Sequence, residues 1–95
     1  MNKSFRIVMM TPGEKVYEGE ALSLRVPATM GSMGVLAGHV PFVSGLLPGR
    51  IVIREPEASA PAVFQLNGKG ILDVSREAVT ILVYEDQGVV PRKNY

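Results

Sequence analysis

His39 is the only histidine in the 95-residue sequence, and histidine is the side chain whose charge changes most readily near neutral pH. Covalent catalysis would require a nucleophile held against it, and the nearest hydroxyl groups in the sequence are Ser32 and Ser44. Neither serine lies in the Gly-x-Ser-x-Gly sequence that exposes a nucleophile at a sharp turn. We therefore interpret His39 as a loop residue that hydrogen-bonds to backbone and fixes the turn before Pro41, with direct contact to a partner as the alternative.

Metal and nucleotide sites are not indicated. One histidine and no cysteine cannot supply the usual ligands of zinc, and the nine acidic residues lack the spacing of a calcium loop. Gly31, Gly34 and Gly38 loosely resemble a phosphate-binding loop, but the Gly-Lys-Ser/Thr ending and the following helix are both missing. The glycines are interpreted as turn or close-approach positions, and we expect no catalytic residue, no metal and no cofactor.

The elements that would position His39 and the two serines are short apolar runs separated by turn residues. The clearest pattern is the alternation of Leu22, Leu24 and Val26 with Ser23 and Arg25, as in a strand with one face on a core. Further short runs lie at residues 5–10, 16–20, 35–36, 42–47, 50–54, 63–66, 71–74 and 78–84, and Pro48-Gly49 suits a tight turn. Turn signals about every 8 to 12 residues, without a helical period, predict an all-β fold: an antiparallel β-sandwich of about ten short strands.

The chain length suits one domain with a single core. We expect the sandwich to occupy residues 1–87 and a short flexible C-terminal tail to occupy residues 88–95. Ten basic and nine acidic residues nearly cancel, and at most two basic residues are adjacent, so neither nucleic acid nor an anionic lipid surface is an expected partner. No window approaches the ~20 apolar residues of a membrane span, and no secretion signal begins the sequence.

One segment carries a specific family signature. Residues 26–41 read Val-Pro-Ala-Thr-Met-Gly-Ser-Met-Gly-Val-Leu-Ala-Gly-His-Val-Pro, and Leu-Leu-Pro-Gly follows at residues 46–49. This segment resembles the signature of ATP synthase epsilon subunits, called delta in mitochondria: Val-Pro-Gly-x-Glu-Gly-x-Phe-Gly-Val-Leu-Pro-Gly-His-Ala-Pro and a Leu-x-Pro-Gly turn. The resemblance continues at residues 11–20, like the family's opening hairpin, and at residues 70–74 and 79–82, like two of its later strands.

The resemblance implies a non-catalytic ten-stranded β-sandwich in the central stalk of an F-type ATP synthase. Such a subunit joins the gamma subunit to the c-ring within the complex that carries the alpha/beta hexamer, and so couples ion translocation to rotary ATP synthesis. It lies peripherally on the cytoplasmic face of the inner (plasma) membrane. The family's gamma-facing positions correspond to Thr11, His39 and Ser44. Its ring-facing positions correspond to Met30, Gly31, Ser32 and Met33.

The sequence departs from the family pattern in the ring-facing loop. Met30 and Ser32 stand where the family usually has acidic residues, so we expect ring contact through packing and hydrogen bonds instead of ion pairs. Ala37 replaces a proline, a local change that the fold should absorb. Many bacterial members continue as a helical hairpin that inhibits ATP hydrolysis, which is not expected of a sequence ending at Tyr95.

Two other classes of function stay open from the sequence. A stand-alone β-sandwich that binds a small ligand would need an apolar pocket with converging polar groups. A small enzyme would need a second titratable group held near His39.

Overall fold

The computed structural model describes residues 3–92, which form ten strands. In chain order they are β1 (Phe5–Met10), β2 (Lys15–Ala21), β3 (Ser23–Ala28), β4 (Gly31–Leu36), β5 (Phe42–Leu46), β6 (Gly49–Arg54), β7 (Ala62–Leu66), β8 (Gly70–Val74), β9 (Ala78–Val83) and β10 (Val89–Arg92). The prediction of an all-β fold with about ten short strands is confirmed.

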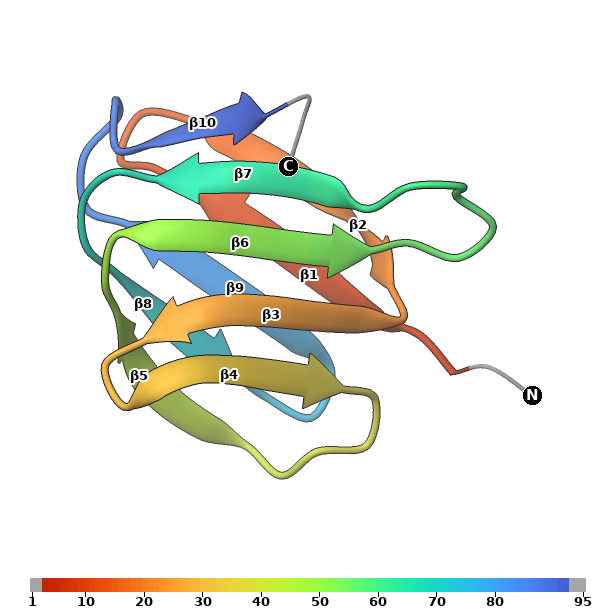
Figure 1. Cartoon of the computed structure of the whole chain (residues 1–95). Helices are drawn as coiled ribbons and strands as arrows, with labels where there is room; N and C mark the ends of the chain where they lie inside the picture. The colour runs from red at the N-terminus through yellow and green to blue at the C-terminus, as the bar shows by residue number, and fades with distance from the viewer. Residues whose placement is uncertain (1–2, 93–95) are drawn as a thin grey trace.

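The ten strands belong to one sheet that curls into two layers. The strand order is β10-β7-β6-β3-β5-β8-β9-β1-β2, and β4 pairs with the free side of β3. The sheet passes from one layer to the other where Ala28 of β3 pairs with Leu46 of β5. Figure 1 shows β7, β6, β3 and β4 in the front layer and β8, β9 and β1 crossing behind them. We call these the β6 layer and the β9 layer.

Alternate aliphatic side chains fill the space between the layers. From the β6 layer come Leu24 and Val26 of β3 with Ile51 and Ile53 of β6; from the β9 layer come Ile7, Met9, Leu72, Val74, Val79 and Ile81. Because successive side chains of a strand point to opposite faces, this alternation places every second residue in the core. Leu22, predicted to share the inward face with Leu24, instead lies half-buried between β2 and β3, where its N–H donates to the carbonyl oxygen of Arg54 at 2.7 Å.

Two features of the sheet were not predicted from the sequence. The strands on either side of Pro48-Gly49 do not pair with each other, because β5 pairs with β8 and β3 whereas β6 pairs with β3 and β7. The turn instead carries the chain between layers, and a Cβ at Gly49 would lie 2.7 Å from the Cβ of Pro27, which explains the need for glycine. β1 and β9 pair in parallel, an exception in a sheet that is otherwise antiparallel over the described residues.

The expected flexible tail at residues 88–95 is corrected by β10. This strand pairs antiparallel with β7, from Val89 opposite Leu66 to Arg92 opposite Val63. Val89 is buried in the core, and the N–H of Asn67 donates to the carbonyl oxygen of Gly88 at 2.7 Å. The sandwich therefore extends past the predicted boundary at residue 87. Residues 93–95 of the predicted tail lie outside the described part of the chain.

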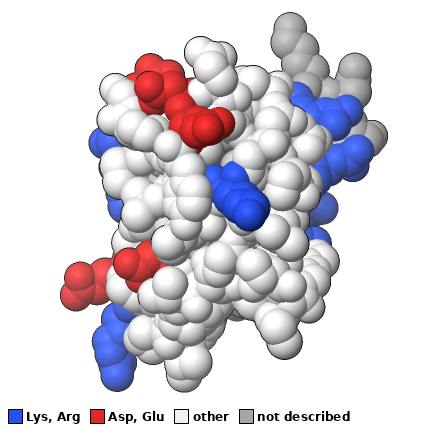
Figure 2. Space-filling view, turned by 90° about the vertical axis from the view of Figure 1, so that its left-hand side faces the viewer, with Lys and Arg blue, Asp and Glu red and all other residues white. Residues whose placement is uncertain are grey.

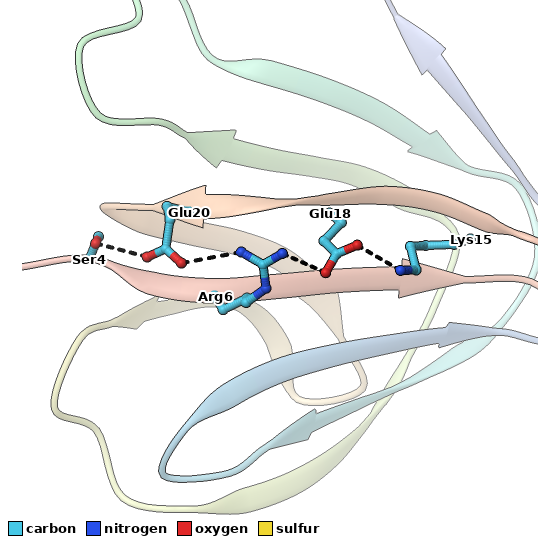
Figure 3. Close-up of polar contacts among 5 residues, drawn as sticks. All are labelled: Ser4, Arg6, Lys15, Glu18 and Glu20. Atoms are coloured by element: carbon cyan, nitrogen blue, oxygen red, sulfur yellow. Dashed lines mark hydrogen bonds and ion pairs between the residues drawn. The ribbon is translucent and has the colours of Figure 1, made fainter.

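A row of charged and polar side chains joins β1 to the edge strand β2 (Figure 3). Arg6 contacts Glu18 at 2.5 Å and Glu20 at 3.4 Å, Lys15 contacts Glu18 at 2.6 Å, and the Ser4 hydroxyl donates to Glu20 at 2.9 Å. The hydrogen bond from Lys15, and then that from Arg6, lowers the pKa of the Glu18 carboxyl. These pairs are exposed and add little to stability, but they cover the outer face of an edge strand with charge, which discourages pairing with another chain.

Gly70 provides a test of the close packing between β8 and β9. A Cβ at Gly70 would lie 2.6 Å from the carbonyl oxygen of Leu82, whereas a Cβ at Gly68 would meet nothing within 4 Å. We expect Gly70→Ala to lower the free energy of unfolding by about 2 kcal/mol, since backbone would have to move, and Gly68→Ala to change it by less than about 0.5 kcal/mol. Urea unfolding of the two variants measures this difference. Equal stabilities would show that the contact at Gly70 is not tight.

Candidate docking surfaces

The structure tests two arrangements considered from the sequence, a metal site and a serine paired with His39. Within residues 3–92 no three His, Cys, Asp or Glu side chains gather closely enough to bind a metal ion. The Ser44 hydroxyl donates to the carbonyl oxygen of Gly45 at 3.1 Å, and the Ser32 hydroxyl accepts from Arg25 at 3.2 Å, so neither serine is paired with His39. This same part of the chain also lacks a helix of the length and apolarity that a membrane crossing requires.

His39 is held by aromatic side chains and not by the backbone hydrogen bond expected from the sequence. Its ring meets Phe5 edge to face, with centroids 5.8 Å apart, and Phe42 in the same manner at 6.4 Å. Both ring nitrogens are buried without a hydrogen-bond partner in the described structure. A buried polar group left unpaired destabilises a fold by roughly 1–3 kcal/mol. His39 therefore contacts the rest of the domain through aromatic packing.

The connection between β4 and β5 exposes an unusual amount of apolar surface. Leu36, Val40 and Val43 are 63%, 75% and 67% exposed, and all three lie within a few residues of His39. We call residues 36–43 the β4–β5 corner. The sequence analysis missed these three residues as site residues: Leu36 and Val43 belong to short apolar runs, and Val40 lies in the turn before Pro41. Such a concentration of exposed apolar groups is typical of a protein contact surface.

A surface depression of about 600 Å³ opens beside this corner. It is lined by Pro41, Phe42, Val43, Asp73, Val74, Ser75, Arg76 and Glu77. The four polar or charged lining residues are all exposed to solvent. A small-molecule site usually has a few polar groups held in place within an apolar cavity. This depression better fits a protruding side chain of a protein partner.

The three predicted gamma-facing residues do not form one cluster. Ser44 lies half-buried on β5, close in sequence to the β4–β5 corner. Thr11 is buried in the turn after β1, where its N–H donates to the carbonyl oxygen of Glu14 at 2.9 Å. Phe5, which contacts His39, begins β1, whereas Thr11 follows its end, so the two sites are roughly 20 Å apart at ~3.3 Å per residue.

The predicted ring-facing residues lie at the turn between β3 and β4, which we call the β3–β4 tip (Met30–Met33). Met30 is 91% exposed, Gly31 and Ser32 are also exposed, and Met33 is half-buried against the core. Gly31 has a φ of 114°, a conformation that favours glycine and turns the chain sharply. The exposed side chain of Leu47 belongs to the same end, because its N–H donates to the carbonyl oxygen of Pro27 at 2.8 Å.

The β3–β4 tip and the β4–β5 corner lie at opposite ends of β4. The tip is on the left in Figure 1 and the corner is on the right. Figure 2 looks onto the left-hand end and shows charged patches separated by wide uncharged surface. The domain thus presents apolar contact groups at two ends of one rigid sandwich.

Comparison with known proteins gives consistent matches. Residues 4–85 match the family model described as ATP synthase, Delta/Epsilon chain, beta-sandwich domain. The ATP synthase epsilon chain of Caulobacter vibrioides is 32% identical over 74 residues, which cover 78% of this chain and 83% of that protein. The ATP synthase epsilon chain of Laribacter hongkongensis is 30% identical over 79 residues, covering 83% of this chain and 56% of the relative. This chain therefore spans little more than half of the Laribacter protein.

A solved structure shares the fold. A chain in the mitochondrial ATP synthase of Euglena gracilis, described with OSCP, F1 and the c-ring, matches with a TM-score of 0.80 and 23% identity. The match covers 93% of this chain and 53% of the Euglena chain. At this identity the likeness supports the architecture alone, and it agrees with the predicted β-sandwich.

The unpaired nitrogens of His39 give a stability prediction. We expect His39→Phe to raise the free energy of unfolding by about 1 kcal/mol, because the aromatic packing is kept and the unpaired polar groups are removed. His39→Ala should lower it by about 1–2 kcal/mol, since it removes the contacts with Phe5 and Phe42. Thermal or urea unfolding measures both changes. A loss of stability in His39→Phe equal to that in His39→Ala would mean that the nitrogens are paired in solution.

Proposed function

The chain belongs to the delta/epsilon family of ATP synthase subunits, and from this premise we propose that it is the epsilon-type subunit of a central stalk. In this role it binds the gamma subunit and the c-ring of an F-type ATP synthase and couples ion translocation to rotary ATP synthesis. It performs no chemistry itself. The match of residues 4–85 to the family's β-sandwich domain is the observation that carries the proposal.

The β4–β5 corner is the proposed contact with gamma. Its exposed aliphatic side chains and the depression beside Val43 offer the apolar centre that protein interfaces use. His39 and Ser44 belong to this contact. Thr11, at the far end of β1, would meet a separate part of gamma. The packing of His39 between Phe5 and Phe42 holds the corner in the shape that would be presented to gamma.

The β3–β4 tip is the proposed contact with the c-ring. Met30, Gly31 and Ser32 are exposed at the end of the sandwich opposite the β4–β5 corner, as a subunit between two partners requires. Met30 has a flexible, polarizable side chain that adapts to an irregular surface. With Met33 behind it and no acidic residue in the tip, this contact relies on packing and hydrogen bonds.

These contacts define where the subunit works. It sits peripherally at the cytoplasmic face of the inner (plasma) membrane, held there by the c-ring and by gamma, in the complex that includes the alpha/beta hexamer. No direct insertion into lipid is involved.

Gamma binding can be tested with two exposed valines. We expect the purified chain to co-elute with the gamma subunit of the same organism, and Val43→Asp to weaken that binding at least about tenfold by placing a charge in an apolar contact. Val90→Asp is the control, because Val90 is exposed on β10 in the other layer. Isothermal titration calorimetry measures both affinities. A folded wild-type chain that does not bind gamma would refute the proposed function.

Ring binding can be tested separately at the β3–β4 tip. Met30→Ala should weaken binding of the chain–gamma complex to purified c-ring by about fivefold to thirtyfold, which corresponds to losing about 1–2 kcal/mol of apolar contact. Leu82→Ala, which trims an exposed side chain on β9, should leave ring binding nearly unchanged. Co-sedimentation with c-ring reconstituted in nanodiscs gives the affinities. Unaltered binding of Met30→Ala would remove the tip from the ring contact.

A further inference from the structure

The outer face of the β6 layer gathers four arginines from separate parts of the chain. They are Arg25 of β3, Arg50 and Arg54 of β6, and Arg92 of β10. The pairing registers place Arg25 opposite Val52, Val52 opposite Val63, and Val63 opposite Arg92, in one row across four strands. Arg50 and Arg54 flank Val52 on the same strand. We call these four side chains the arginine ring, because they surround Val52 and Val63.

Val63 shows that the centre of the arginine ring is covered. By register it points away from the core, since its neighbours Ala62 and Phe64 are the residues that pack inward. It is nevertheless only 3% exposed. Surrounding atoms of the fold therefore cover it, and Val52 remains the partly exposed apolar residue at the centre of the ring.

The arginine ring has no counter-charge within the described structure. The five strands of the β6 layer contain no Asp or Glu. The ion pairs found in residues 3–92 all involve Arg6 or Lys15 at β1 and β2. Glu55, the nearest acidic residue along the chain, accepts a hydrogen bond from Tyr17 instead. Figure 2 shows basic side chains along its right-hand margin, the side on which this layer lies.

The guanidinium groups are exposed, and their protein contacts are neutral. Arg25 donates to the Ser32 hydroxyl at 3.2 Å, and Arg92 donates to the side-chain oxygen of Gln65 at 3.1 Å. A groove of about 440 Å³ runs between Arg25 and Arg50, with Pro27 and Val52 in its lining. The surface therefore combines unpaired positive charge with an apolar floor.

The size of the arginine ring limits what can bind to it. Arg50 and Arg54 are about 13 Å apart along β6, and Arg25 and Arg92 are separated by three strand spacings, about 14 Å. A single small anion would reach at most two of these groups. An α-helix that carries carboxylates over two turns spans about 11 Å and can meet three or four of them. Arginine also pairs with carboxylates through two parallel hydrogen bonds.

From this arrangement we propose that the arginine ring is a docking surface for an acidic helix of a partner protein. The helix places an apolar side chain in the groove over Val52 and its carboxylates on the surrounding arginines. The site is separate from the β4–β5 corner and adjoins the β3–β4 tip, whose Gly31 and Ser32 also line the groove. It goes beyond the proposed contacts with gamma and the c-ring because neither of those contacts uses the four arginines.

A designed peptide tests the proposal. The probe is an alanine-based helix of about 15 residues with one leucine and four glutamates on one face, and the matched control carries glutamines in their place. Titration into the full chain at low salt, followed by amide NMR shifts and fluorescence anisotropy, should place the changes on β3, β6, β7 and β10. The glutamine peptide should bind at least about tenfold more weakly.

Variants separate specific docking from general charge attraction. Arg50→Gln/Arg54→Gln should weaken binding of the glutamate peptide at least about tenfold, and Arg50→Lys/Arg54→Lys should recover only part of it because lysine cannot pair bidentately. Arg6→Gln/Arg76→Gln makes the same charge change away from the arginine ring and should alter the affinity for the glutamate peptide less than about twofold. Unfolding curves check that each variant is folded. Binding to gamma should be unchanged in Arg50→Gln/Arg54→Gln, which keeps this test distinct from the proposed function.

Three results would overturn the proposal. One is the absence of glutamate-peptide binding by the folded chain at low salt. Another is equal weakening by the two pairs of glutamine substitutions. The third is binding only to phosphatidylglycerol vesicles or to DNA, with none to the peptide, which would assign the surface to a different class of polyanion.

Discussion

Burial of alternate aliphatic side chains between two layers of one curled sheet is the constraint on which the remaining surface depends. Once Ile51 and Ile53 face the core, Arg50, Val52 and Arg54 must face outward, and pairing across β3, β7 and β10 then sets their neighbours. A slip of one residue in this register would bring arginines into the core, which no nearby carboxylate could compensate. The inner packing and the outer charge pattern are thus two results of the same alternation.

Much of the fold is readable from the sequence because it is local. The alternation around Leu24 and Val26 predicts β3, and the turn signals predict the number of strands. The crossing at Pro48-Gly49 and the parallel pair of β1 with β9 are not local, since they depend on which distant strand each one meets. β10 has only four residues, too few for its pattern to be separated from a tail.

Some residues of the candidate docking surfaces could be predicted from the sequence, and others could not. Met30 stands out in the sequence because a large apolar residue occupies a glycine-rich turn, and the structure exposes it. The family resemblance predicts that Thr11 and His39 both face gamma, yet the length of β1 separates the two residues in the structure. The exposure of Val40 and Val43 and the convergence of the arginines follow from three-dimensional pairing. No window of sequence contains that information.

The parallel contact between β1 and β9 links the first and the ninth of the ten strands in the described residues. During synthesis, β1 and β2 can form a hairpin early, but the apolar side chains Ile7 and Met9 cannot reach their neighbours Val79 and Ile81 until residues 78–83 have left the ribosome. The β9 layer therefore closes only after more than seventy residues that follow β1 have been made, and topologies rich in such distant pairings fold slowly. Chaperones and early-binding partners would meet the chain in this open form, before the finished sandwich exists.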